Sequence, residues 1–335
     1  MTKASKLTSE VSKKQREIVL SIQDLQIYFY TYAGVVKAID GITLDLYKRE
    51  TLGLVGETGC GKSVTASAIL KLVDSPGKIV GGKILFQGED LLKKSEQEMR
   101  KIRGGKIAMI FQDPTTYLNP VYTVGDQIFE VIREHQKLTS KQELRKSAVE
   151  ALKLVQLQDP ERLVERYPHE LSTGMRQRVM IAMMLCCHPT LLIADEATTA
   201  LDVTVQAQIL RLIEELKKEL DMSLLFITHN LGVIAAICDR VAVMYAGKIL
   251  ELGSKFDVFD NPLHPYTRGL LGAIPRFDQD FEKELLVIPG TLPNLMNPPE
   301  GCRFYDRCES KLPKCQSTKP ELREIEDGHF VSCFG

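Results

Sequence analysis

One eight-residue segment restricts the fold of this chain more than any other. Residues 56–63 read GETGCGKS and match the pattern G-x-x-x-x-G-K-[ST]. A continuously apolar run at 51–55, typical of a strand buried in a parallel sheet, precedes the segment, and a helical pattern at 62–73 follows it. In this setting the glycines let successive backbone N–H groups converge on phosphate oxygens, and the start of the helix adds a partial positive charge. The sequence therefore predicts a phosphate-binding loop in an α/β fold.

The side chains of this loop have distinct expected tasks. Lys62 is expected to reach the β- and γ-phosphates of a nucleoside triphosphate, and Ser63 is expected to bind Mg²⁺. The alternative is a glycine-rich turn that binds nothing, which the flanking strand and helix disfavour. The predicted nucleotide-binding residues of this segment are Gly56, Glu57, Thr58, Gly59, Cys60, Gly61, Lys62, Ser63 and Val64.

A second apolar run ends in two carboxylates. Residues 191–196 read LLIADE, and the C-terminal end of this predicted strand is expected beside the phosphate-binding loop, where α/β sheets bind ligands. Asp195 suits a Mg²⁺ ligand, directly or through water, and Glu196 suits the polarisation of an attacking water. The alternative is an exposed acidic strand end, which the presence of the phosphate-binding loop disfavours.

Strand and helix patterns alternate through the middle of the chain. Buried strands are expected at 191–194 and 224–228, and helical segments at 203–220 and 232–238. This alternation favours a βαβ core with a parallel sheet.

Two further regions flank this core. Residues 18–46 carry short β-rich runs typical of antiparallel strands, and residues 127–156 have a helical pattern inside an expected helical subdomain at about 113–185. Proline and glycine become frequent after Asn261, which marks a boundary. The predicted fold class is an α/β P-loop NTPase (RecA-like) core with an antiparallel β subdomain and an α-helical subdomain, plus a small cysteine-containing C-terminal extension.

Charge and hydropathy limit where such a protein can work. The formal net charge is -1, so the overall balance does not indicate a nucleic-acid binder. No apolar run reaches the roughly 18 residues of a membrane-spanning helix. Residues 1–17 form a polar, lysine-rich tail without an apolar segment behind it, so a secretory signal is not expected. We expect a cytoplasmic chain that acts at a membrane only through a partner.

A third motif places the chain in a family. Residues 171–178 read LSTGMRQR, lie upstream of Asp195 and precede a helical pattern. They resemble the signature motif of ABC ATPases, usually L-S-G-G-Q. The order of motifs is also that of the family, because a glutamine after a strand (110–112) stands between the phosphate-binding loop and the signature, and TALD (199–202) and ITH (227–229) follow the acidic strand. The resemblance covers roughly residues 18–260, which we expect to form the ABC ATPase domain.

The resemblance implies a mechanism in which two such subunits stack head to tail with two ATP molecules between them. Ser172 and the N–H of Gly174 are then expected to contact the γ-phosphate of the ATP held by the partner. Gln112 is expected to bind or sense Mg²⁺ and the pore subunit. His229 is expected to hold the γ-phosphate and the attacking water in line, and Asp202 to couple the two sites.

The resemblance also implies an aromatic ring stacked on adenine. Phe29 is the predicted residue, because of its spacing before Ala38. Tyr28, Tyr30 and Tyr32 stay open as alternatives, as does simple packing of any of these rings.

Two residues depart from the family signature. Thr173 stands where a glycine is usual, and Met175 stands where glutamine is usual. A Cβ at Thr173 restricts close approach of the backbone to phosphate, so one composite site is expected to be weaker than the other.

The C-terminal part resembles a particular branch of the family. Residues 261–268 (NPLHPYTR) and 298–304 (PPEGCRF) look like the extension of the oligopeptide/dipeptide importer ATPases, here at 261–335. This resemblance implies an ATP-hydrolysing subunit that powers import of di- or oligopeptides at the cytoplasmic face of the membrane. Its implied partners are two transmembrane permease subunits, a second and different ATPase subunit, and, indirectly, an extracytoplasmic solute-binding protein. The alternatives are an oligosaccharide importer of the same family, an ABC ATPase acting on nucleic acid, and a non-catalytic scaffold subunit.

Four cysteines distinguish this extension. Cys302, Cys308, Cys315 and Cys333 follow the spacing C-x₅-C-x₆-C-x₁₇-C, which lacks the close cysteine pairs of structural zinc sites. The resemblance to the importer extension points to a [4Fe–4S] cluster with these four thiolates as ligands. Zn²⁺ and four free buried thiols are the alternatives. Three nearby cations, Arg303, Arg307 and Lys311, are expected to offset the negative charge of such a cluster.

Overall fold

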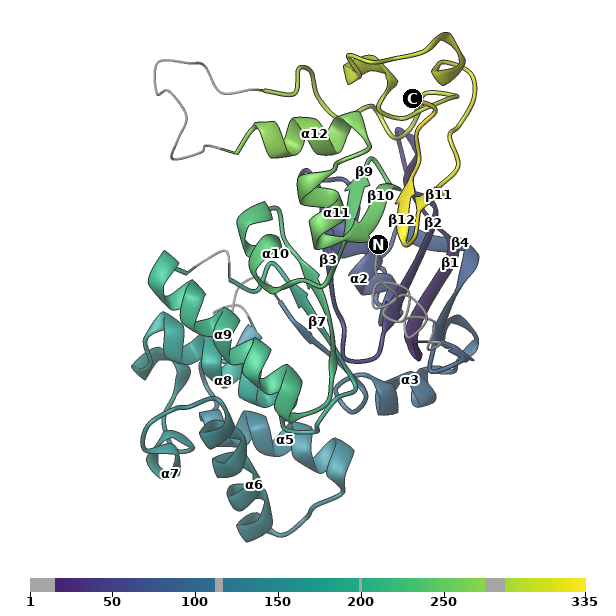
Figure 1. The fold of residues 1–335 in the computed structure, drawn as a ribbon. Helices are drawn as coiled ribbons and strands as arrows, with labels where there is room; N and C mark the ends of the chain where they lie inside the picture. Colours follow the sequence, from purple (N-terminus) through teal and green to yellow (C-terminus); the bar gives the residue numbers. More distant parts are fainter. Residues whose placement is uncertain (1–15, 112–116, 199–200, 275–286) are drawn as a thin grey trace, which may run out of the picture.

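The structure is a computed structural model that describes residues 16–111, 117–198, 201–274 and 287–335 (Figure 1). Twelve strands in the described ranges form two sheets. Their bounds are β1 Ile18–Thr31, β2 Gly34–Tyr47, β3 Thr51–Val55, β4 Gly77–Phe86, β5 Glu89–Asp90, β6 Ile107–Ile110, β7 Leu191–Asp195, β8 Ser223–Ile227, β9 Arg240–Tyr245, β10 Lys248–Ser254, β11 Arg323–Glu326 and β12 His329–Val331.

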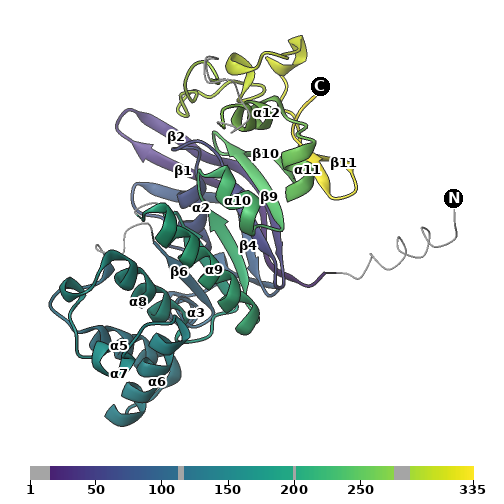
Figure 2. The ribbon, with the colours of Figure 1, turned by 60° about the vertical axis from the view of Figure 1, so that its left-hand side comes forward.

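The helices lie on both sides of the larger sheet and beyond its edge (Figures 1 and 2). The α-helices are α2 Lys62–Ile69, α3 Glu96–Ile102, α5 Val124–Gln136, α6 Lys141–Leu154, α7 Pro160–Leu163, α8 Thr173–Leu185, α9 Val203–Glu219, α10 Leu231–Ile237, α11 Lys255–Asp260 and α12 Pro265–Gly272. Short 3₁₀ helices are η1 Leu91–Lys93, η2 Pro168–Glu170, η3 Tyr305–Arg307 and η4 Pro313–Cys315. None of the helices in the described ranges has the length and apolar character that a membrane crossing requires.

The larger sheet has eight strands in the order β11-β12-β10-β9-β3-β8-β7-β6. The five strands from β9 to β6 run parallel, and β10, β12 and β11 extend the sheet by antiparallel pairing. Every residue of β3, β7 and β8 is buried, which explains why these strands read as continuous apolar runs in the sequence. The smaller, antiparallel sheet has the order β2-β1-β4-β5.

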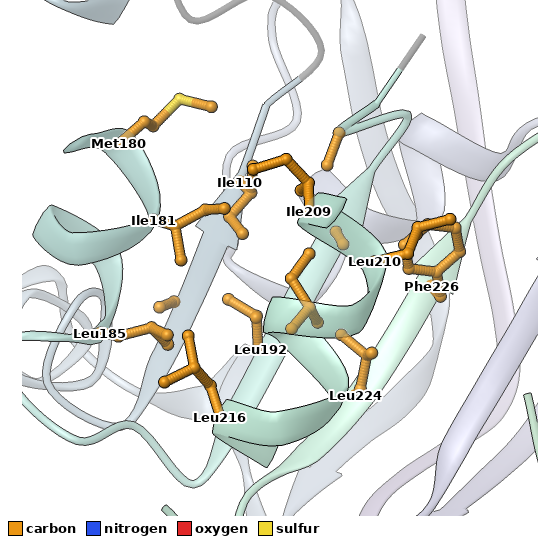
Figure 3. Close-up of a cluster of buried hydrophobic side chains, with 14 of the residues drawn as sticks. Ile110, Met180, Ile181, Leu185, Leu192, Ile209, Leu210, Leu216, Leu224 and Phe226 are labelled. Atoms are coloured by element: carbon orange, nitrogen blue, oxygen red, sulfur yellow. The ribbon is translucent and has the colours of Figure 1, made fainter. Parts of the chain in front are cut away.

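The two faces of the parallel strands belong to two different hydrophobic clusters. Side chains alternate along each strand, so Leu192 and Ala194 join one cluster while Leu191 and Ile193 join the other. Figure 3 shows the first cluster, in which Leu192, Leu224 and Phe226 of the sheet meet side chains of α8 and α9 such as Ile181, Leu185 and Leu216. The second cluster joins the sheet to α2 and the antiparallel sheet. The predicted arrangement of an α/β core with an antiparallel β part and a helical part is confirmed.

The helix predicted at 62–73 ends earlier than expected, and the helical pattern at 127–156 is divided between two helices. The pattern at 62–73 is helical only as far as Ile69, because Lys71 adopts a left-handed conformation at φ 55°. The pattern at 127–156 forms two helices, α5 and α6. Lys137 closes α5 at φ 57°, and α6 begins after Ser140.

The C-terminal residues return to the ATPase core. β12 pairs with β10, so Val331 lies opposite Glu251 and Phe330 opposite Leu252. In Figure 1 α12 and the C-terminal segment lie above α11 and the labelled strands β9 and β10 of the large sheet. The extension is thus continuous with the sheet that carries the candidate site.

Candidate active site

The phosphate-binding loop connects β3 to α2 and passes close to neighbouring backbone. Gly56 has a φ of +153°, and a Cβ on it would lie 2.0 Å from the carbonyl oxygen of Met244 in β9. Gly61 has a φ of +111°, and its Cβ would lie 2.5 Å from Cδ1 of Ile39 in β2. Gly56 is therefore required by packing against backbone as well as by its own conformation, and Gly61 is required chiefly by its positive φ.

Lys62 lies inside the loop, where only 5% of it is exposed. Its Nζ donates to the carbonyl oxygen of Gly56 at 2.8 Å and to that of Glu57 at 3.1 Å. The Sγ of Cys60 lies 3.8 Å from the same nitrogen. The loop thus surrounds a positive charge, which a polyphosphate requires.

Asp195 ends β7 beside the start of α2. Its Oδ1 atom is buried and has no hydrogen-bond partner, although the side chain is hydrogen-bonded to Ser63. Burial raises the pKa of Asp195 above its usual value, while the Ser63 hydrogen bond and the charge of Lys62 act in the opposite direction. A serine hydroxyl beside a carboxylate oxygen that lacks a partner is an oxygen ligand set that fits Mg²⁺.

Glu196 and His229 follow the neighbouring strands β7 and β8, and their side chains are in contact. The Oε1 of Glu196 and the Nδ1 of His229 are 3.2 Å apart. Glu196 has a φ of +47°, an uncommon conformation for a residue with a side chain, and its N–H donates to the carbonyl oxygen of Ile227 at 2.9 Å. Backbone strain of this kind clusters at active sites, where it orients a reacting side chain.

Lys62, Ser63, Glu196 and His229 line one cavity of about 440 Å³. Ala38 also lines it and was not identified from the sequence, because a small residue in a strand carries no motif. The lining residues are Ala38, Thr58, Gly59, Gly61, Lys62, Ser63, Val64, Glu196 and His229.

Two predicted contacts for a partner's ATP, Ser172 and Gly174, lie outside this cavity, as does Asp202, the residue predicted to couple the two sites. Ser172 is the N-cap of α8, and its Oγ accepts the N–H of Met175 at 3.3 Å. Asp202 is the N-cap of α9, and its Oδ1 accepts two N–H groups at 3.0 and 3.1 Å. A Cβ on Gly174 would lie 3.2 Å from Cγ1 of Val205, so the starts of α8 and α9 are in contact.

Of two further predicted site residues, Phe29 and Gln112, the structure describes only Phe29. Phe29 packs its ring against the backbone of Gly77, because a Cβ on Gly77 would lie 2.8 Å from Cε1 of Phe29, and it does not line the cavity. Among the alternatives, Tyr32 is fully exposed at the turn between β1 and β2, whereas the Tyr28 hydroxyl donates to Asp40 at 3.2 Å. Gln112 lies outside the described residues.

Comparisons with known proteins identify the family. Residues 39–199 match the ABC transporter family, and residues 250–315 match the family described as oligopeptide/dipeptide transporter, C-terminal region. The chain is 51% identical to the dipeptide transport ATP-binding protein DppD of Bacillus subtilis over 95% of each chain. The chain belongs to the ABC transporter ATP-binding proteins of the oligopeptide/dipeptide type. Another such relative, the oligopeptide transport ATP-binding protein OppD of Escherichia coli, is 47% identical over 98% of this chain and 96% of that one.

Solved structures match the ATPase part of this ABC protein. A dimeric ATP-binding cassette in a post-hydrolysis state, bound to ADP and phosphate, is 26% identical and has a TM-score of 0.63 over 70% of this chain and 98% of that chain. The cbiO1 protein of Clostridium perfringens, part of an ABC transporter complex, is 28% identical with a TM-score of 0.63 over 73% of this chain and 92% of that chain. The predicted P-loop NTPase fold is therefore confirmed.

The four cysteines of the ABC protein's extension lie within electrostatic reach of one another. Cys302 and Cys315 are buried, and the N–H of Cys302 donates to the carbonyl oxygen of Cys315 at 2.8 Å. Burial raises the pKa of the Cys302 thiol to about 11, and the thiols of Cys315, Cys308 and Cys333 act in the same direction. Across the described parts of the chain, however, no three His, Cys, Asp or Glu side chains are arranged to hold a metal ion.

The two arginines that were predicted to offset the charge of a cysteine-bound cluster pair with carboxylates in the structure. The guanidinium group of Arg303 donates to Asp40 at 3.0 Å, and that of Arg307 donates to Glu57 at 2.9 Å. Both arginines are buried and form ion pairs with carboxylates of the ATPase domain. Their positive charges therefore lie against the carboxylates of Asp40 and Glu57.

Proposed function

We propose that this chain binds Mg-ATP and hydrolyses it to power the import of di- or oligopeptides through separate permease subunits. The single observation that carries the hydrolytic part is the contact of 3.2 Å between Glu196 and His229 at the mouth of the phosphate-binding loop. The peptide part is supported by the names of the relatives, which transport dipeptides or oligopeptides.

Each residue of the site has one task in this proposal. Lys62 binds the β- and γ-phosphates, and Ser63 with Asp195 holds Mg²⁺, which when bound neutralises charge on the phosphate oxygens. Glu196 accepts the proton of the attacking water. His229 holds the Glu196 carboxylate and the γ-phosphate in line.

The positions of the N-termini of α8 and α9 support a second ATPase subunit. Ser172 and Gly174 lie outside the chain's own cavity, as expected if they contact an ATP held by a second ATPase subunit. Asp202, at the start of the neighbouring helix α9, couples the two sites in this proposal. The dimeric solved cassette supports this arrangement. We propose that the second ATPase is a different chain, that two permeases span the membrane, and that a solute-binding protein delivers peptide from outside. The chain itself then works at the cytoplasmic face, and it makes no contact with nucleic acid.

Substitution of Glu196 tests the hydrolytic part. In the assembled transporter, Glu196→Gln should retain ATP binding, lose turnover and trap the ATP-bound ATPase dimer, because the closed state persists when water is not activated. Glu219→Gln removes an exposed carboxylate from the end of α9 and is the matched control. Wild-type turnover in Glu196→Gln would show that another group is the base.

We also propose a [4Fe–4S] cluster on Cys302, Cys308, Cys315 and Cys333. The support is the gathering of four thiols that influence one another's pKa values, and the absence of close cysteine pairs in their spacing. Binding it requires the four sulfur atoms to come closer together, since the described residues contain no group of three side chains already arranged as metal ligands. Protein purified without oxygen should be brown and contain iron and sulfide in equal amounts. Colourless protein with one zinc ion would favour Zn²⁺, and protein with neither metal would leave four free thiols.

A further inference from the structure

Two residues of the C-terminal extension contact the phosphate-binding loop at Glu57. The hydroxyl of Tyr266 in α12 accepts the backbone N–H of Glu57 at 3.0 Å. The Nη1 of Arg307 donates to Oε2 of Glu57 at 2.9 Å. The carbonyl oxygen of Glu57 accepts from Nζ of Lys62 at 3.1 Å, so the N–H, the carboxylate and the carbonyl of this residue are all engaged.

The two contacting residues are themselves held rigidly. Tyr266 is fully buried and lies in an aromatic cluster, with ring centroids 4.7 Å from Tyr245 and 5.3 Å from Phe304. Arg307 is 9% exposed, and it donates to the carbonyl oxygens of Pro289 at 2.8 Å and Ile288 at 3.2 Å. A side chain fixed by several partners holds its target in one position, which is the requirement for preorganising a binding site.

The extension also holds the opposite wall of the cavity. Arg303 donates to Asp40 at 3.0 Å, and its Nη1 donates to the carbonyl oxygen of Lys37 at 3.3 Å. The N–H of Lys37 in turn donates to the carbonyl oxygen of Leu295 at 2.9 Å. Lys37 precedes Ala38, which lines the cavity, so the loop and the facing strand are both anchored to the extension.

We propose that Tyr266 and Arg307 are positioning residues of the nucleotide site. They act through Glu57, by fixing the first turn of the phosphate-binding loop so that Lys62 and the later N–H groups are arranged before the nucleotide arrives. Without them the loop samples other conformations, and the observed Kd equals the intrinsic Kd divided by the fraction of molecules whose loop is correctly arranged. The inference rests on the proposed binding of ATP and adds the source of the loop's order.

The smallest test removes one oxygen atom. Tyr266→Phe keeps the aromatic packing and deletes the acceptor for the Glu57 N–H. In the purified full-length chain we expect the Kd for ATP to rise about fivefold, the effect of one neutral hydrogen bond. The Kd for ADP should rise equally, because the loop contacts phosphates that both nucleotides carry. In the assembled transporter KM for ATP should rise while kcat at saturating ATP is retained, since Glu196 and His229 are untouched.

A matched control lies in the same extension. Tyr305→Phe removes a hydroxyl from a ring that contacts Lys311, with Nζ 5.1 Å from its centroid, and leaves Glu57 alone. It should bind ATP as the unmodified chain does. A circular dichroism melt of each variant checks that it is folded at the assay temperature.

A second pair of variants tests the ion pair. Glu57→Gln and Arg307→Lys should each weaken ATP binding, and the double variant should be weakened by less than the sum of the two single effects, because both changes disturb the shared contact between Glu57 and Arg307. Additive effects, or an unchanged ATP affinity in Tyr266→Phe, would overturn the inference. An unmodified chain that binds no ATP would instead refute the proposed function, so the two failures are distinguishable.

Discussion

Glu251 is the residue on which attachment of the C-terminal extension depends most. It lies in the middle of β10 and is fully buried. Its carboxylate accepts the backbone N–H of Leu263 at 2.8 Å, the N–H of His264 at 2.9 Å and the Nε2 of His329 at 2.8 Å. It therefore joins the start of α12 and the strand β12 to the central sheet. We predict that Glu251→Ala releases both segments.

The magnitude follows from the groups left behind. Three donors lose their acceptor, and an unsatisfied buried donor costs about 1–3 kcal/mol. Water entering the vacated space reduces the sum, and breaking one side of a buried charged contact typically costs about 3–5 kcal/mol. We therefore expect Glu251→Ala to lower the free energy of unfolding by about 3–5 kcal/mol. This is a large part of the roughly 5–15 kcal/mol by which a folded domain is stable.

Urea denaturation and hydrogen exchange measure this directly. Exchange should accelerate at the N–H groups of Leu263 and His264 and along β12 before it accelerates in β3 or β8. Glu326→Ala removes an exposed carboxylate from the adjacent strand β11 and should change the unfolding free energy by less than about 0.5 kcal/mol. A loss below about 1 kcal/mol in Glu251→Ala, with unchanged exchange in α12, would refute the reasoning.

Two further predictions concern the signature and the acid stability. Thr173→Gly should raise turnover at the partner ATPase's site and leave the chain's own site nearly unchanged, which transporters with one site disabled by substitution can separate; equal effects would count against it. Burial lowers the pKa of His264 to about 3, with a smaller effect from Arg268, so His264 stays neutral when folded. In the unfolded chain the His264 side chain has a pKa near 6.5, so it takes up a proton there at a higher pH than in the folded protein. The stability that the folded protein gains from neutral His264 is therefore complete above about pH 6.5 and is lost as the pH falls, which lowers the free energy of unfolding by about 2 kcal/mol between pH 7 and pH 5. In His264→Asn, which keeps an acceptor for the Tyr266 N–H, the difference in unfolding free energy between these two pH values should shrink accordingly.

The structural elements that the sequence predicted correctly are those encoded in short contiguous patterns. The loop from Gly56 to Ser63 follows from its glycines and its flanking strand and helix, and the strand ending at Asp195 follows from an unbroken apolar run. The phosphate-binding loop and the end of β7 lie close together because β3, β8 and β7 are adjacent parallel strands whose C-terminal ends share one edge of the sheet.

The anchoring residues could not be predicted, because no local pattern links them to the loop. Tyr266 and Arg307 stand 209 and 250 residues from Glu57 in the sequence. Glu251 has the appearance of a polar surface residue, and only the tertiary structure provides its three donors. For Phe29 the spacing suggested a ring near adenine, whereas the strand directs this ring against Gly77.

Peptide uptake into proteoliposomes tests the central claim most directly. The transporter is reconstituted with its permeases, its second ATPase and its binding protein, and uptake of a labelled peptide is followed with ATP supplied on the side of this chain. We predict uptake that requires ATP and is abolished by Glu196→Gln but not by Glu219→Gln. ATP-dependent uptake that persists in Glu196→Gln would contradict the assigned catalytic role, and uptake of an oligosaccharide in place of the peptide would contradict the assigned substrate.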